Sequence, residues 1–159
     1  MDGRNGMAID RNFIGCTSAP RTIAVEKGQL KFFAKAAGEE NPVYFDEDAA
    51  AAAGHRALPA PPTFAFSLML GAPPDRGDLL RDMGVDMRSI LHGEQKFRHF
   101  EQIYAGDSIT LVTETVDIFS KKEGQLEFVL QRTWAENQDG QLCTELDVLT
   151  IVRNRETAG

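Results

Sequence analysis

The sequence predicts a single α+β domain in which an antiparallel sheet wraps a helix, and three observations lead to this prediction. The chain has 159 residues, a length that suits one domain with its own hydrophobic core. Its first half carries a short apolar pattern of helical period, and its second half carries long runs rich in β-branched residues. No internal repeat or low-complexity linker separates the halves, so we expect a flexible leader over residues 1–12 and one domain over 13–155.

Composition and charge are those of an ordinary soluble globular protein. Apolar residues make up 42% and charged residues 26%, and the net charge is −7. This charge argues against non-specific binding of nucleic acid. A phosphate-bearing ligand would need a local basic patch, for which Lys31, Lys35, Arg56, Lys96 and Arg98 are the candidates. No apolar run could span a bilayer and the N-terminus lacks the apolar core of a secretory signal, so we expect a cytoplasmic protein that does not enter membranes.

The cysteines and histidines give little sign of metal or nucleophilic chemistry. Cys16 and Cys143 lie far apart, outside any CxxC pair, and no histidine stands at ligand spacing from either. We expect two free, buried or half-buried thiols, no metal and no cofactor. His99 is expected to be a strand residue that faces solvent.

The helix that the sheet should wrap is predicted over residues 29–38. Leu30, Phe33, Ala34 and Ala37 recur at helical spacing on one face. A helix so short and so apolar is expected to lie inside the sheet rather than on the surface. Gly38 is a suitable C-terminal stop, and Pro42 forbids continuation.

Two further helical segments follow. Asp46 should cap a short alanine-rich helix that ends at Gly54. Three prolines, Pro59, Pro61 and Pro62, then hold an extended segment. Thr63 should cap the apolar run Phe64–Leu70, which must be buried against the core, a partner or a ligand. Residues 78–83 predict one more short helix.

From Leu91 onward the pattern indicates an antiparallel meander of long strands. The expected strands cover residues 91–103, 108–121, 125–137 and 142–153, with Gly93 as a bulge and turns at 105–107, 121–124 and 138–141. In the last strand, Leu142, Leu146 and Val148 alternate with Cys143, Glu145 and Asp147, as in a half-buried strand.

Three stretches together resemble the MaoC-like dehydratase family. They are AGEENPVYFDEDAAAAAG, APPTFAF and LHGEQKFRHFEQIYAGDSIT, in that order, and the resemblance runs from about Phe13 to Val152. It is closest to the N-terminal MaoC dehydratase branch, which includes the (3R)-hydroxyacyl-ACP dehydratase subunits. The resemblance implies a hotdog fold that pairs sheet edge to sheet edge. It also implies reversible hydration of a trans-2-enoyl thioester to a (3R)-3-hydroxyacyl thioester, which is hydro-lyase chemistry.

The hydratase motif of that family reads Gly-Asp-x-Asn-Pro-aliphatic-His. Its counterpart here runs from Gly38 to Tyr44 as Gly-Glu-Glu-Asn-Pro-Val-Tyr. By this resemblance Glu39 and Tyr44 stand at the catalytic positions that Asp and His normally occupy. Tyrosine, with an ordinary pKa of about 10, is a poor base but can donate a hydrogen bond or a proton. The alternatives are that Glu39 is a solvated acid beyond a helix end and that Tyr44 is a buried aromatic residue.

The resemblance also suggests which residues contact substrate. These are Asn41, Pro42, Gly54, His55, Pro62, Thr63, Phe64, His92 and Gly93. His55 is alternatively a polar surface residue, and His92 either lines the site or fixes a bulge.

Three functions remain open at this level. The first is an (R)-specific enoyl-thioester hydratase (a 3-hydroxyacyl-thioester dehydratase) or a subunit of one. The alternative is a non-catalytic hotdog subunit that binds an acyl thioester and stabilises a catalytic partner. A thioesterase that uses Glu39 ranks last. The expected partners are an acyl-CoA or acyl-ACP thioester and a second hotdog chain, identical or different. Acyl chain length, carrier and activity of the chain alone are not determined by the sequence.

Overall fold

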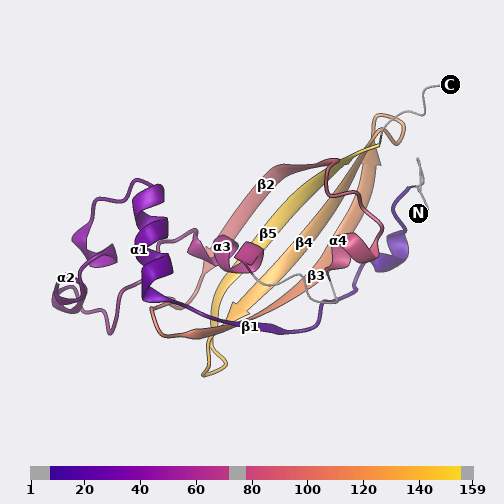
Figure 1. Ribbon diagram of the computed structural model, residues 1–159. Helices are drawn as coiled ribbons and strands as arrows, with labels where there is room; N and C mark the ends of the chain where they lie inside the picture. Colours follow the sequence, from indigo (N-terminus) through magenta and orange to yellow (C-terminus); the bar gives the residue numbers. More distant parts are fainter. Residues whose placement is uncertain (1–7, 72–77, 155–159) are drawn as a thin grey trace.

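The computed structural model describes residues 8–71 and 78–154 and contains one five-stranded antiparallel sheet (Figure 1). The strands are β1 (Arg21–Ala24), β2 (Ile90–His99), β3 (Ser108–Lys121), β4 (Leu126–Glu136) and β5 (Leu142–Arg153), in the order β1-β3-β4-β5-β2. Together with the helices they form a single α+β domain, which confirms the predicted fold class.

Helices lie on one face and at one end of this sheet. They are η1 (Arg11–Phe13), α1 (Lys27–Ala36), η2 (Pro42–Tyr44), α2 (Glu47–Ala52), α3 (Phe64–Gly71) and α4 (Leu79–Asp82). Figure 1 shows α3 and α4 over one sheet face, whereas α1 and α2 lie together beyond the end of the sheet.

The helix that the sheet covers is α3, so the prediction that the helix at 29–38 takes this place was wrong. In α3, Phe64 and Leu68 are each only 3% exposed, and the Phe66 ring meets the His92 ring edge to face at 5.3 Å. On α1, Leu30 is fully buried but Phe32 is 76% exposed. Helical periodicity shows that a helix has an apolar face, but not how far that helix lies from the sheet. The lack of a polar face in α3 is the stronger sign of a central helix.

Strand β2 occupies an edge of the sheet and pairs with β5, not with β3. The predicted meander is therefore correct for β3, β4 and β5 and wrong for β2. The register shift between His92 and Glu94 confirms the bulge predicted at Gly93. A Cβ atom there would lie 2.9 Å from Ile151 Cδ1 and 3.0 Å from the Leu149 carbonyl oxygen, so only glycine fits without a shift. The strand ends at His99, four residues before the predicted end.

Alternation in β5 holds from Thr144 to Val152 but not at the start of the strand. Leu146 and Val148 are buried as predicted, whereas Cys143 is fully buried although its pattern places it with Glu145. A register shift between Ala135 and Glu136 on the paired strand displaces this end. Cys16 is exposed, so the expectation of a buried or half-buried thiol fails for it; both cysteines are free.

The N-terminal segment is described from residue 8 onward, and residues 1–7 of the expected leader lie outside the described residues. Ile9 is buried, and its N–H donates to the buried Glu127 carboxylate at 2.6 Å. Asn154 donates to the other oxygen of the same carboxylate at 2.9 Å. Glu127 therefore ties the two ends of the described chain to β4.

Candidate functional site

The turn that carries the predicted catalytic pair begins where α1 stops. Gly38 adopts a φ of +77°, a conformation that costs other residues strain. The Glu39 N–H donates to the Ala34 carbonyl at 2.9 Å and the Gly38 N–H to the Lys35 carbonyl at 3.2 Å, the two bonds of a Schellman motif. This local geometry closes the helix as predicted and leaves Glu39 half-buried immediately beyond it.

Asn41 and Pro42 then start a new helical turn that carries Tyr44. The Asn41 side chain accepts from the Val43 N–H at 3.2 Å, and Pro42 occupies the first turn of η2, where its missing N–H costs nothing. Both residues are exposed. Their described role is to shape the turn, so their predicted contact with substrate stays a prediction.

Tyr44 lies in the electrostatic field of Glu39. Partial burial, and then the charge of Glu39, raise the pKa of the Tyr44 hydroxyl above its ordinary value. At neutral pH this hydroxyl keeps its proton and can donate a hydrogen bond, but it cannot act as a base. The structure thus brings the two predicted catalytic residues together in one turn, with a tyrosine hydroxyl where the resembled motif has an imidazole.

The segment after α2 attaches this turn to the sheet. Asp46 caps α2 by accepting from the Asp48 and Ala49 N–H groups at 2.7 and 3.0 Å, as predicted. Gly54 follows the helix with a φ of +89°. His55 Nδ1 lies 3.1 Å from the Tyr104 hydroxyl, so its described partner is a tyrosine on the turn before β3.

Next to His55, Arg56 forms an ion pair with the buried Asp107, which the sequence does not predict. The Arg56 guanidinium donates to both carboxylate oxygens of Asp107 at 2.6 and 2.8 Å and lies over the Tyr104 ring at 4.3 Å. Asp107 is 1% exposed and also accepts from the Tyr104 N–H and from Gln138 Nε2. The AGD turn at 105–107 was a usable signal, because an acid after a turn glycine often accepts local backbone N–H groups.

Arg56 is therefore paired with an acid, and so are two other residues of the predicted basic patch. Lys96 Nζ lies 3.2 Å from Glu94, and Arg98 Nη1 lies 3.1 Å from Glu145. Lys31 and Lys35 are exposed on α1. The five cations do not gather into one described site.

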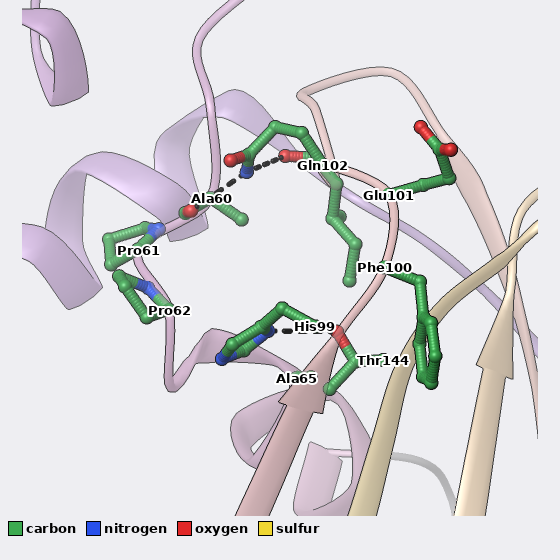
Figure 2. Close-up of a pocket in the computed structure, with 10 residues that line it drawn as sticks. Ala60, Pro61, Pro62, Ala65, His99, Phe100, Glu101, Gln102 and Thr144 are labelled. Atoms are coloured by element: carbon green, nitrogen blue, oxygen red, sulfur yellow. Dashed lines mark hydrogen bonds between the residues drawn. The ribbon is translucent and has the colours of Figure 1, made fainter.

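A pocket of about 310 Å³ opens between the start of α3 and the end of β2 (Figure 2). Its lining consists of Ala60, Pro61, Pro62, Ala65, His99, Phe100, Glu101, Gln102, Ile103 and Thr144. Of the predicted substrate-binding residues, only Pro62 belongs to this lining. Thr63 is exposed, and in its described hydrogen bond the Phe66 N–H donates to the Thr63 backbone carbonyl. The predicted cap by the Thr63 side chain is therefore not seen. Phe64 points into the core, with its ring 5.4 Å from that of Phe33.

His99 is an exposed residue of β2, as the sequence predicts, and it also lines this pocket. Its Nδ1 lies 3.4 Å from Thr144 Oγ1 on the neighbouring strand. Strand alternation places His92, Gln95, Phe97 and His99 on the helix-facing side of β2, opposite Thr150, Val148, Leu146 and Thr144. The bulge at Gly93 keeps His92 in this row, against Phe66.

The predicted site residues thus fall into separate places: the turn with Glu39 and Tyr44, the segment with Gly54 and His55, the pocket with Pro62, and the edge strand with His92 and Gly93.

Within residues 8–71 and 78–154, no group of three or more His, Cys, Asp or Glu side chains could hold a metal ion. In the same residues, no helix is long and apolar enough to cross a membrane. Burial, and then the charge of Asp107, raise the pKa of Cys143 to about 11, so this thiol is not a nucleophile.

Sequence comparisons identify relatives over most of the chain. A family model described as a FAS1-like dehydratase domain region matches residues 12–146. A UPF0336 protein of Streptomyces griseus is 36% identical over 156 residues, which cover 96% of this chain and 100% of the relative. A UPF0336 protein of Streptomyces coelicolor is 39% identical over 122 residues, or 74% of this chain and 78% of that one.

Solved structures share the fold. The truncated HadBC complex of Mycobacterium tuberculosis, a (3R)-hydroxyacyl-ACP dehydratase, contains a chain with TM-score 0.74 and 28% identity, covering 87% of this chain and 96% of that one. The ChsH1-ChsH2 complex of the same organism gives a TM-score of 0.73 at 21% identity, with coverages of 89% and 91%. The R-hydratase PhaJ1 of Pseudomonas aeruginosa gives 0.64 at 19% identity, with coverages of 90% and 83%. The last two likenesses concern the fold alone.

Proposed function

This chain belongs to the family of FAS1-like dehydratase domain regions, and from that premise we propose a function for it. It is a non-catalytic subunit of a heteromeric (3R)-hydroxyacyl-thioester dehydratase, and a partner hotdog chain supplies the aspartate and histidine that move protons. This chain contributes part of the substrate pocket and the sheet edge to which the partner binds.

The protonated Tyr44 carries this proposal. Addition of water to an enoyl thioester needs a base that activates the water. By the resemblance to the family motif, Tyr44 stands at the position of the histidine, and its pKa, raised above the ordinary value of about 10, keeps the hydroxyl protonated at neutral pH. In the described part of the chain, His55 bonds to Tyr104 and His99 to Thr144, and neither bonds to Glu39 or Tyr44. Glu39 alone lacks the imidazole that completes the acid–base pair.

Strand β2 supports the assignment of a partner chain. It is ten residues long, and its only described neighbour in the sheet is β5, so one edge is unpaired in the described residues. A long edge strand without proline is a template for pairing with another chain. The opposite edge, β1, has only four residues. The HadBC and ChsH1-ChsH2 neighbours are complexes of two named components, which supports a heteromeric assembly.

The pocket supports a role in substrate binding. It lies at the end of β2, so a chain that pairs with β2 would stand beside it. Its walls are mostly apolar, through Ala60, Pro61, Pro62, Ala65 and Ile103, as in small-molecule sites that rely on a few placed polar groups.

A second candidate function is hydration by this chain alone through an altered Glu39–Tyr44 pair. The proximity of the two side chains favours it, since Glu39 perturbs the titration of Tyr44. In that mechanism Glu39 would orient water and Tyr44 would deliver a proton. A thioesterase has no observation of its own in its favour.

The test follows loss of enoyl absorbance with a short and a long trans-2-enoyl-CoA. We expect no turnover by the pure chain, and turnover by its complex with a hotdog chain that carries Gly-Asp-x-Asn-Pro-x-His. In the complex, replacement of the partner's histidine should lower kcat by about 10²- to 10⁴-fold. Glu39→Gln and Tyr44→Phe in this chain should leave kcat unchanged.

Turnover by the pure chain that falls in either variant would overturn the proposal in favour of the altered pair. Hydrogen exchange gives an independent check of the assembly. The backbone amides of β2 that do not bond to β5 should exchange fast in the isolated chain and slowly in the complex. Equal exchange in both states would contradict pairing through β2.

A further inference from the structure

The sheet face opposite α3 and α4, the outer face, carries large apolar side chains that lie outside both clusters of core residues (Figure 1). Strand register places six of them in two adjoining rows across β3, β4, β5 and β2: Phe119, Phe128, Ile151 and Leu91 in one row, and Leu130 and Leu149 in the next. Five of the six are half-buried or exposed. A contiguous apolar patch of this kind marks an interaction surface.

A row of four charged residues borders this patch on the same face. In register across β3, β4, β5 and β2 it reads Glu114, Arg132, Asp147 and Lys96, so the sign of the charge alternates from strand to strand. Arg132 donates to both carboxylate oxygens of Asp147 at 2.7 and 2.8 Å. Glu114 and Lys96 stand at opposite ends of the row, three strand spacings or about 14 Å apart. Reversed end to end, the row is its own charge complement.

A second copy of the chain can use this complementarity. A two-fold axis that runs parallel to the strands, midway between β4 and β5, places β3 of one copy against β2 of the other and β4 against β5. Glu114 then faces Lys96 of the second copy, Arg132 faces Asp147 of the second copy, and the apolar rows face each other. A two-fold interface requires this kind of self-complementary surface. Sheets that pack face to face keep their strands within about 30° of each other, an offset that lysine and glutamate side chains can span.

The remaining charges of the face fit the same arrangement. The row of Leu130 and Leu149 ends in two acids, Asp117 on β3 and Glu94 on β2, which would face each other at the rim, where solvent and salt screen them. Glu94 is also compensated by Lys96 at 3.2 Å. A strongly acidic or strongly basic partner would meet two like charges in the charged row, so the alternation favours a second copy.

We propose that the outer face binds a second copy of this chain back to back, with the two sheets packed face to face. This contact is separate from the β2 edge and from the pocket, and it does not rest on the proposed function. Where the β2 edge also holds a catalytic partner, the two contacts together give a complex with two copies of each chain.

The test measures the dissociation constant of the full chain by sedimentation velocity at low ionic strength. Glu114→Lys and Lys96→Glu should each raise this constant by about 10-fold, because the two-fold axis sets each opposed pair of like charges twice. Lys31→Glu, an equal charge reversal on the exposed surface of α1, is the matched control for Lys96→Glu and should associate like the unmodified chain. Circular dichroism checks that every variant is folded.

A mixture of the two single variants is the decisive sample. One copy then presents two cations and the other two anions at the ends of the row, so the mixture should associate about as tightly as the unmodified chain. Glu114 and Lys96 lie too far apart to pair within one chain, so only contact between copies can produce this rescue.

The inference falls if the full chain stays monomeric, if Glu114→Lys leaves the dissociation constant unchanged, or if mixing brings no rescue. Dimers that respond to Lys96→Glu alone would indicate pairing through the β2 edge instead of the outer face. A monomeric chain whose complex with the catalytic partner is lost on Leu130→Glu would mean that the partner, and not a second copy, covers this face.

Discussion

Two acids of this protein follow a glycine of positive φ, and their surroundings differ completely. Glu39 follows Gly38 (φ +77°) at the end of α1, is half-buried and lies near Tyr44. Asp107 follows Gly106 (φ +91°) before β3, is 1% exposed and accepts hydrogen bonds from Arg56, Tyr104 and Gln138. The same local pattern thus gives one carboxylate without described side-chain hydrogen bonds, Glu39, and one whose two oxygens both accept hydrogen bonds, Asp107.

The difference shows that a glycine–acid pair predicts a turn but not the role of the acid. A carboxylate with all its oxygens bonded serves the fold, because its charge is compensated and its geometry is fixed. One without described side-chain hydrogen bonds is available to a ligand, a partner or water. By this criterion Asp107 is structural, and Glu39 is the member of the pair that remains open to function.

The largest expected effect comes from removal of the buried acid. Asp107→Ala leaves the Tyr104 N–H and Gln138 without their acceptor and Arg56 without its counter-charge. We expect a loss of about 2–4 kcal/mol in the free energy of unfolding, less than for a fully buried pair because Arg56 is half-exposed. Urea unfolding measures it. Glu39→Ala, the matched control, should change stability by less than about 0.5 kcal/mol. Equal losses in the two variants would contradict the comparison.

The two glycines should respond alike, whatever the role of the acid that follows. Gly38→Ala and Gly106→Ala each force a side chain into the left-handed region, and a Cβ at either position meets no atom within 4 Å. We expect each to cost about 1–2 kcal/mol in urea unfolding, from backbone strain alone. A much larger loss at Gly106 would mean that the turn and the Asp107 cluster form one cooperative unit.

A smaller effect is expected at the edge of the Asp107 cluster. Tyr104→Phe removes the hydroxyl that lies 3.1 Å from His55 Nδ1 and keeps the ring beneath Arg56. The loss should be about 0.5–1.5 kcal/mol in the same unfolding experiment, the value of one hydrogen bond. His55→Phe in the Tyr104→Phe background should then cost little more. Additive losses would mean that the two side chains do not interact.

The smallest effect concerns the titration of Tyr44. In a Tyr104→Phe background, tyrosinate absorbance reports Tyr44 alone, since the chain has two tyrosines. Its pKa should lie above the ordinary value of about 10, and Glu39→Gln should lower it only in part, because burial is the larger cause. A raised folded-state pKa contributes stability that is present below pH about 10 and is lost as pH rises through the folded-state value. If Glu39→Gln left the pKa of Tyr44 unchanged, the charge of Glu39 would not influence the Tyr44 hydroxyl.

Features set by neighbours in the chain were predictable. Gly38 ends α1 through its positive φ, Asp46 caps α2, and Gly93 produces the bulge in β2, each by a mechanism that involves a few nearby residues. The strand-rich second half follows from its β-branched composition. The turn that carries Glu39 and Tyr44 was found in the same way, through a contiguous motif.

Features set by distant segments were not predictable. The pairing of β2 with β5, the place of α3 rather than α1 over the sheet, and the burial of Asp107 by Arg56 all join residues far apart in sequence. His99 is the clearest case, because it is exposed as predicted but nothing near it in the sequence indicates that it also lines a pocket. Its role depends on Thr144, 45 residues later, and on the prolines before α3.

The sequence by itself determined the fold class and the helix and strand breaks, since these depend on backbone preferences and short-range hydrogen bonds. The altered Glu39–Tyr44 motif was seen only through the resemblance to a family pattern. Only the tertiary structure decided which helix lies over the sheet, which strands form its edges and which polar groups face the pocket. Those outcomes depend on burial and on contacts between segments that meet only when the chain has folded.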